Sequence, residues 1–299
     1  MKARVSVMML VLSGLLFTMG CQRSPVSPTS PVSMSIFYTA QLGTPGVGVA
    51  LNASGDVYVE NKQISQLSAN GTPMTQWGNG VWTPSIAGIG IGPSGNVYVV
   101  DEGNNRVDKF SSNGSPITEW GTFGKGQGQF ESPNGIAISA SGIVYVADSI
   151  NCRIEEFSST GTYLGAWGSL GHGNGQLNTP TAIAVNNTSG DVYVADFGNQ
   201  RVQEFTSTGT YITQWGSKGN SAGQFSAPAG IAISSSGNVF VADDSSDRIQ
   251  EFSSSGIYIT QWNTPAVSGY LDQPDGIAIN ANGIYIANEL MPSTASVYN

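Results

Sequence analysis

Residues 192–205 read VYVADFGNQRVQEF, and close copies of this stretch recur along the chain. Residues 97–110 read VYVVDEGNNRVDKF, residues 144–157 read VYVADSINCRIEEF and residues 239–252 read VFVADDSSDRIQEF. In each copy, two runs rich in β-branched and aromatic residues flank a short polar turn, which is the pattern of two strands joined by a turn. The stretch therefore predicts a hairpin that the chain uses repeatedly.

The complete repeat is longer than this hairpin. A small apolar strand such as Gly-Ile-Ala-Ile precedes each copy, and a strand ending in Trp follows it, so each repeat offers four strands. The aromatic residue of the second strand recurs at spacings of 40, 47, 48, 47 and 45 residues: Tyr58, Tyr98, Tyr145, Tyr193, Phe240 and Tyr285. A period of this length is typical of a β-propeller with one blade per repeat. We predict an all-β fold, a six-bladed β-propeller of four-stranded antiparallel blades.

The ends of the repeat region indicate how the ring closes. The last repeat has a predicted third strand at 295–298 and then ends, so its outer strand is missing. The unclaimed segment 36–43 resembles the outer strand at 211–216. We therefore expect the N-terminal strand to complete the last blade, which would remove two exposed sheet edges.

The first 33 residues have a different composition. Lys2 and Arg4 precede an apolar run over residues 5–17, which predicts an export signal over 1–20. With Cys21 after it, the segment resembles a bacterial lipoprotein signal, and this resemblance implies a lipid on Cys21 and a place in the bacterial cell envelope, at the outer membrane or periplasmic face. An ordinary secretory signal or an uncleaved anchor is the alternative. The Pro- and Ser-rich residues 21–33 predict a flexible tether, and 34–299 form the propeller.

The repeat region resembles NHL-repeat proteins over residues 34–299. The resemblance rests on Pro-x-Gly-Ile-Ala, Val-Tyr-Val-Ala-Asp, Asn-x-Arg-Val-Gln-x-Phe and Gly-Gln-Phe phrases, which are clearest in repeats two to five. The first repeat has Glu60 in place of the Asp, and the last has Asn288. The resemblance implies a module that binds proteins or RNA, while related propellers act as lyases or lactonases around a metal.

Four Asp/Arg pairs are the most conspicuous charged residues. An Asp that ends one strand and an Arg that opens the next can form an ion pair across the turn. The same Asp/Arg pair recurs in every full repeat, whereas a reaction needs only one site. We therefore interpret the pairs as structural: Asp101/Arg106, Asp148/Arg153, Asp196/Arg201 and Asp243/Arg248.

A candidate binding face appears when the repeat pattern is subtracted from the sequence. The aromatic residues outside the pattern are Trp82, Phe123, Phe197 and Tyr270, all in loops expected on one mouth of the propeller. Leu170 with His172, and Leu290 with Met291, lie in further loops of that mouth. An apolar and aromatic surface of this kind is typical of a binding face. The alternative is that these residues only pack the loops onto the barrel.

The enzyme alternative requires a metal at the channel mouth. His172 is the one His of the chain, which excludes a three-His zinc site. The residue before each inner-strand Gly should face the mouth, and this ring reads Val47, Ala87, Asn134, Thr181, Ala229 and Asp275. Asn134 and Asp275 are the ring's candidate Ca²⁺ ligands. We find no nucleophile–base pair, and the hypothesis of a binding module predicts no cofactor.

The charge balance argues against nucleic acid. Loss of residues 1–20 leaves nine basic and twenty acidic residues, a net charge of −11. Nucleic-acid binding needs clustered positive charge, and four of the nine are the repeat Arg residues. The sequence therefore favours an envelope-anchored, non-catalytic binding or scaffolding propeller with a protein partner, attached to the membrane through its lipid only. The alternatives are a metal-dependent lyase- or lactonase-like enzyme, and a carbohydrate-binding propeller.

Overall fold

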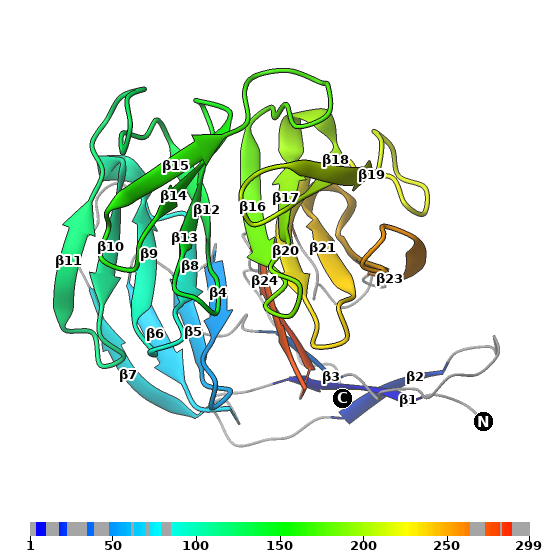
Figure 1. The fold of residues 1–299 in the computed structure, drawn as a ribbon. Helices are drawn as coiled ribbons and strands as arrows, with labels where there is room; N and C mark the ends of the chain where they lie inside the picture. The colour runs from blue at the N-terminus through cyan, green and yellow to red at the C-terminus, as the bar shows by residue number, and fades with distance from the viewer. Residues whose placement is uncertain are drawn as a thin grey trace.

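The repeated hairpins form the two middle strands of four-stranded antiparallel sheets in the computed structural model. The structure describes residues 4–9, 18–22, 35–38, 48–60, 63–69, 72–78, 85–263, 273–281 and 283–288. Figure 1 shows the sheets side by side around a central axis, which is the arrangement of a β-propeller. The predicted all-β propeller of four-stranded antiparallel blades is thus confirmed.

Each complete blade runs from its inner to its outer strand in chain order. The first has β4 (Gly48–Leu51), β5 (Val57–Glu60), β6 (Ile64–Leu67) and β7 (Pro73–Trp77). The second has β8 (Gly88–Ile91), β9 (Val97–Asp101), β10 (Arg106–Phe110) and β11 (Pro116–Trp120). The third has β12 (Pro133–Ile138), β13 (Val144–Asp148), β14 (Arg153–Phe157) and β15 (Tyr163–Trp167).

Two more blades follow the same plan. The fourth has β16 (Pro180–Val185), β17 (Val192–Asp196), β18 (Arg201–Phe205) and β19 (Tyr211–Trp215). The fifth has β20 (Pro228–Ile233), β21 (Val239–Asp243), β22 (Arg248–Phe252) and β23 (Tyr258–Asn263). Short 3₁₀ turns join the second strand to the third in three blades: η1 (Glu102–Asn104), η2 (Phe197–Asn199) and η3 (Asp244–Ser246).

The predicted number of blades is wrong. Five four-stranded blades are present among the described residues, and the remaining sheet has the order β2-β1-β3-β25-β24. In it, β24 (Pro274–Asn280) and β25 (Gly283–Asn288) pair antiparallel as inner and second strands do elsewhere. The strand β24 packs between β20 and β4, which closes the ring of inner strands.

The N-terminal strand joins this last sheet in a different way from the prediction. The strand β3 (Ser35–Tyr38) pairs directly with β25, and the pairing is parallel. It thus stands where an antiparallel third strand stands in the other blades. Figure 1 shows the N-terminal strands, in dark blue, beside the C-terminal strands in orange-red. The predicted third strand at 295–298 lies outside the described residues.

The predicted export segment also contains paired strands. The strands β1 (Arg4–Met9) and β2 (Thr18–Gln22) pair antiparallel, and β1 pairs parallel with β3. Cys21 lies in β2. No helix among the described residues is long and apolar enough to cross a membrane. The signal, the lipid and the tether remain predictions.

The core lies between neighbouring blades. The second strands are buried on both faces, and their aromatic residues, such as Tyr193 and Phe240, are fully buried. The outer-strand Trp residues pack against these clusters, as the Trp167 ring does against Phe205 at 4.5 Å between centroids. Gly209 of the next blade lies over the Trp167 ring with φ of 79°, so a side chain there is excluded by both the ring and the backbone.

The inner strands approach one another closely, and most have glycine at the position of closest approach; β16 has Ala182 there. A Cβ at Gly135 would lie 2.6 Å from the carbonyl oxygen of Thr181 on the next inner strand. This contact explains the glycine of the Gly-Ile-Ala phrase in that blade, because a residue without a side chain lets the next backbone approach. The residue before each such glycine is consequently held at the wall of the channel.

The Asp/Arg pairs hold the loops that lead from each outer strand to the next inner strand. Arg201 Nε donates to Asp196 Oδ2 at 2.7 Å, and the same guanidinium donates to the carbonyl oxygens of His172 and Gln176 at 2.9 and 2.8 Å. Asp196 Oδ1 accepts the backbone N–H of Asn178 at 2.7 Å. Both members of the pair therefore bind the loop 168–179 to the fourth blade, and we call this arrangement the loop clamp.

The loop clamp recurs in neighbouring blades. Arg153 pairs with Asp148 at 2.8 Å and donates to the Gln129 carbonyl at 2.8 Å. Arg248 pairs with Asp243 at 2.9 Å and donates to the Gln224 carbonyl at 2.6 Å. Arg106 pairs with Asp101 at 3.1 Å, and also lies 2.7 Å from Glu119. All four Asp side chains are fully buried.

We predict that Arg248→Ala strongly destabilises the protein. The substitution leaves the buried Asp243 carboxylate without its counter-charge and removes the bonds to the loop carbonyls. Breaking a buried pair on one side costs about 3–5 kcal/mol of unfolding free energy. Equilibrium urea unfolding of the full chain measures the loss.

Lys218→Ala is the matched control, since Lys218 is an exposed cation in the same loop. We expect its unfolding free energy to stay within about 0.5 kcal/mol of the original protein. Equal losses in the two variants would contradict the structural role of the loop clamp.

Candidate functional site

Two sets of loops gather on the face of the propeller where the inner strands begin. One set connects an outer strand to the next inner strand, over 121–132, 168–179 and 216–227. The other connects the second strand to the third strand, at 149–152 and at η1, η2 and η3. The loop clamps join the two sets, so this mouth is a surface of loops held on a rigid barrel.

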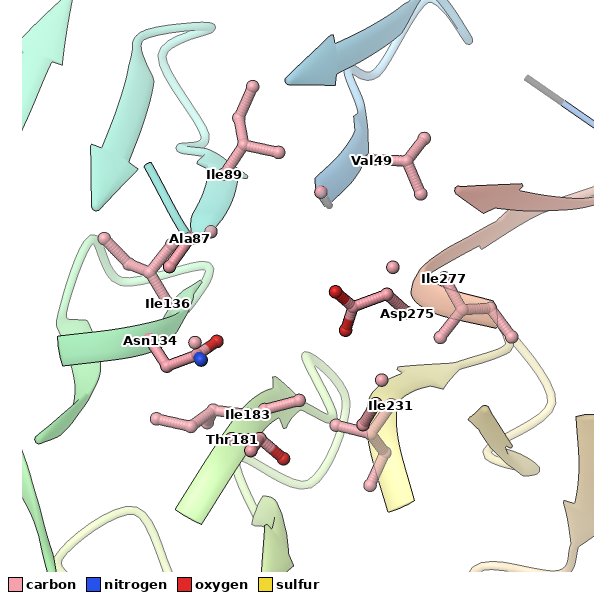
Figure 2. A pocket seen from close by; sticks show the side chains of 17 residues that line it. Val49, Ala87, Ile89, Asn134, Ile136, Thr181, Ile183, Ile231, Asp275 and Ile277 are labelled. Carbon is pink, nitrogen blue, oxygen red and sulfur yellow. The ribbon is translucent and has the colours of Figure 1, made fainter. Parts of the chain in front are cut away.

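A cavity of about 90 Å³ lies on the propeller axis. Figure 2 shows the Asp275 carboxylate reaching toward the middle of the cavity and Asn134 facing it from the other side. The Thr181 hydroxyl donates to the Pro228 carbonyl at 3.0 Å, so it is occupied by a neighbouring strand. Apart from these three, the lining side chains are aliphatic or glycine: Gly48, Val49, Ala87, Gly88, Ile89, Gly135, Ile136, Ala182, Ile183, Ala229, Gly230, Ile231, Gly276 and Ile277.

Most of the predicted channel ring therefore does line the channel. Ala87, Asn134, Thr181, Ala229 and Asp275 all face the cavity. Val47 lies outside the described residues. The placement follows from the glycine contact between inner strands, which holds the preceding residue at the wall.

The donors in the cavity fit a Ca²⁺ ion only in part. Asp275 and Asn134 supply a carboxylate and an amide oxygen, which are the kinds of ligand that Ca²⁺ prefers, yet the ion takes six to eight oxygens. The carbonyl oxygens of Asn134, Thr181 and Asp275 lie against glycines of the neighbouring strand. Among the residues that the structure describes, no three His, Cys, Asp or Glu side chains come together as metal ligands.

A second carboxyl group is buried beside the cavity. Glu60 is 1 % exposed, and its Oε2 lies 3.0 Å from where a Cβ would stand on Gly48 of the cavity wall. Burial, with the nearby Asp275 charge, raises the pKa of Glu60 to about 8. This carboxyl is therefore protonated at neutral pH, and it is a titratable group next to Asp275.

The register corrects the sequence interpretation of Glu60. Glu60 pairs with Gly48 and Ile64, as Val100 pairs with Gly88 and Val107 in the second blade. It thus occupies the small apolar position before the clamp Asp and does not replace that Asp. The strand β5 is one residue shorter than β9, so Glu60 aligns with Val100 and not with Asp101.

Exposed apolar side chains lie in the mouth loops of two neighbouring blades. Phe123 and Leu170 are 68 % and 70 % exposed at equivalent positions of successive loops, and Ile150 and Phe197 are 52 % and 37 % exposed in the adjacent turns. We call these four residues the apolar mouth patch. Large exposed apolar side chains gathered in this way are typical of a binding surface.

Hydrogen bonds join the loops that carry the patch. The Asn151 amide donates to the Gly124 carbonyl at 2.9 Å, which ties the Ile150 turn to the Phe123 loop. The Asn199 amide donates to the Gly171 carbonyl at 2.9 Å in the same way for Phe197 and Leu170. The hydrogen bond that joins turn and loop is therefore repeated in the two blades, while Ile150 and Phe197 occupy adjacent, non-equivalent positions of the turn.

The structure brings together only some of the predicted binding residues. Phe123 and Phe197 are on the mouth as expected, and Leu170 joins them. Trp82, Tyr270, Leu290 and Met291 lie outside the described residues. Ile150 was not predicted, although the equivalent positions Gly103, Gly198 and Ser245 mark it as an exception to the repeat.

Polar groups surround the apolar mouth patch. Lys125 is exposed in the Phe123 loop and lies 3.7 Å from Glu131, and Lys218 is exposed in the next loop, 216–227. His172 Nδ1 lies 2.6 Å from Asn199 Oδ1. The patch thus has an apolar centre with a polar border, the arrangement of many protein interfaces.

Comparison with known proteins places the fold. The NHL repeat family model matches residues 177–205, the segment that contains β16, β17, η2 and β18. Comparison with curated proteins finds no match.

Several solved structures share the propeller. Virginiamycin B lyase from Staphylococcus aureus is 17 % identical, with a TM-score of 0.61 over 83 % of this chain and 79 % of that chain. A nidogen/laminin complex is 17 % identical, with a TM-score of 0.61 over 82 % and 85 %. A gluconolactonase from Xanthomonas campestris is 12 % identical, with a TM-score of 0.61 over 82 % and 84 %.

At these identities the likeness extends to the fold, because one fold carries many activities. The chain is a β-propeller, and the NHL repeat model matches its residues 177–205.

Proposed function

We propose that this protein is a non-catalytic binding propeller that presents its loop-rich mouth to a protein partner. The apolar mouth patch carries the proposal: four large apolar side chains are exposed on loops that buried ion pairs hold in place. Rigid loops lose little conformational entropy on binding, which favours a preformed contact surface. The likeness to a propeller solved in a nidogen/laminin complex is consistent with a protein partner.

We predict that Phe123→Ser combined with Leu170→Ser weakens partner binding at least about tenfold, since truncated apolar anchors cost about 1.4 kcal/mol or more. Stability should stay within about 1 kcal/mol, because both side chains are mostly exposed. The full chain and the variant are each used to capture partners from an envelope extract, and the bound amounts are compared.

Ile117→Ser with Ile212→Ser is the matched control. These side chains are 50 % and 45 % exposed on the outer strands, away from the mouth. A partner retained by this control and lost by the mouth variant supports the proposal. Equal retention by all three proteins would overturn it.

The second candidate is a metal-dependent lyase- or lactonase-like activity. Asp275 and Asn134 facing the channel cavity favour it, and two of the proteins with the same fold are a lyase and a gluconolactonase. In that case Asp275 and Asn134 would hold the ion, and the metal would act as a Lewis acid on the substrate. A carbohydrate-binding role would rest on Trp82 and Tyr270.

The enzyme candidate predicts a rise in melting temperature with Ca²⁺. Saturation at about a hundred times Kd stabilises a folded protein by about 2.7 kcal/mol. A thermal titration of the full chain should then show a shift that EDTA reverses and Asp275→Asn abolishes. If Ca²⁺ and EDTA leave the melting temperature unchanged, the channel metal is ruled out and the binding role stands.

We further propose that the protein is exported and anchored in the bacterial cell envelope by a lipid on Cys21. The basic start, the apolar run and Cys21 support this, with the Pro- and Ser-rich 21–33 as a tether. Several acyl chains bind a membrane stably, whereas an acidic head contributes no attraction to anionic lipids.

Cys21→Ser should release the protein from the membrane fraction, because it removes the lipid attachment site. Fractionation of cells that express the full chain, followed by detection of the head, measures this. Persistence of the variant in the membrane fraction would contradict the lipid anchor and favour an uncleaved apolar anchor.

A further inference from the structure

One clamped loop of the mouth rests on a carboxyl group where the two following blades use an amide, while the preceding blade has Asp108 at this position. Glu155 of β14 pairs in register with Val146, as Gln203 of β18 pairs with Val194 and Gln250 of β22 pairs with Val241. All three side chains are fully buried. They are the same position in three successive blades.

The two glutamines show what this position does. Gln203 Oε1 accepts the backbone N–H of Gly175 at 3.0 Å, and its Nε2 donates to the Gln176 carbonyl at 2.7 Å. Gln250 repeats both bonds with the next loop, at 2.9 Å to Gly223 and 2.6 Å to the Gln224 carbonyl. The position therefore needs one acceptor and one donor.

A carboxylate supplies the acceptor but lacks the donor. Neither oxygen of the buried Glu155 carboxyl makes a hydrogen bond of regular geometry, although Arg153 lies 2.9 Å away and the backbone of Gly128, the counterpart of Gly175, favours the charged form. The counterpart of the Gln176 carbonyl is that of Gln129, which already accepts a bond from Arg153 at 2.8 Å. Only a protonated Glu155 can reproduce the amide donor at that carbonyl.

Burial favours the neutral acid against the attraction of the nearest cation. Burial raises the pKa of Glu155 to about 7; the Arg153 guanidinium, 2.9 Å from Oε1, opposes this, and the Asp148 charge on β13 adds to it. Arg153 is shared, because it also pairs with Asp148 and bonds to loop carbonyls. The remaining titratable group whose electrostatics couple to Glu155 is Tyr163 on β15.

We infer that Glu155 is a neutral carboxylic acid in the folded protein below neutral pH, that it then donates its proton in a hydrogen bond to the Gln129 carbonyl, and that loss of this proton to solvent above neutral pH loosens the loop 121–130. This loop carries Phe123, the most exposed aromatic side chain of the apolar mouth patch. The inference rests on the proposed function only in treating this loop as part of a binding surface. Glu155 is thus a positioning residue that makes one half of the patch sensitive to pH.

The direction of the effect follows from linkage. The folded-state pKa lies above the ordinary value of 4.5, so the folded state binds more protons than the unfolded state between these values. The contribution of Glu155 to stability is therefore full below about pH 4.5 and is lost as pH rises through about 7. An amide at this position does not titrate.

The test compares Glu155→Gln with the original full chain. We expect a small difference in melting temperature at about pH 5 that grows in favour of the variant, on the order of 5 °C, at about pH 8. Gln203→Glu should introduce the same dependence into the fourth blade, with a loss of stability that grows as pH rises. Differences that do not change with pH in either variant would overturn the inference.

Hydrogen exchange of the free protein locates the effect. The Gly124 and Phe130 amides bond within the loop 121–130, at 3.0 and 2.9 Å, and the Gly171 and Leu177 amides do so in the loop held by Gln203. Between about pH 5 and pH 8, protection should fall in the first loop and hold in the second, and Glu155→Gln should remove this contrast. Equal behaviour of the two loops would contradict it. No partner is present, so the outcome is independent of whether the mouth binds one.

Discussion

The buried ion pair between the Asp that ends one strand and the Arg that opens the next is the constraint on which this propeller's mouth depends. Each pair lies within a single hairpin, yet its remaining hydrogen-bonding capacity is directed at a loop of the preceding connection. Because a desolvated pair is stable only when its remaining donors and acceptors are satisfied, the loop carbonyls and amides are as necessary as the charges. An ion pair within one hairpin thus fixes the position of a loop on the mouth.

This constraint explains why the mouth combines rigidity with variation. The clamp contacts the loops through backbone atoms, so the side chains at their tips are free to differ: Phe123 and Leu170 in two loops and Lys218 in the third. The apolar mouth patch occupies the third and fourth blades, whereas the fifth presents polar groups there. A repeated scaffold therefore displays an asymmetric surface, which is what recognition of one partner requires.

The buried carboxyl groups are departures from the same repeat. Glu155 stands where the fourth and fifth blades have glutamine and the second has Asp108, and Glu60 stands where other blades have valine or alanine. Both have a raised pKa because burial disfavours the charged form. Such departures from the repeat give single blades a chemistry that the others lack. Glu155 is a titratable group beneath a loop, and Glu60 is a second acid beside Asp275.

The sequence by itself determined the blade: its strands, its Asp/Arg pairs, its buried aromatic residues and the channel position of Asn134 and Asp275 all follow from local patterns that recur. Such patterns suffice because strand pairing and turn chemistry within one repeat involve residues close in the chain. The tertiary structure alone decided the parallel pairing of β3 with β25 and the hydrogen bond that ties the Ile150 turn to the Phe123 loop. Both depend on contacts between segments distant in the chain, for which period and composition carry no signal.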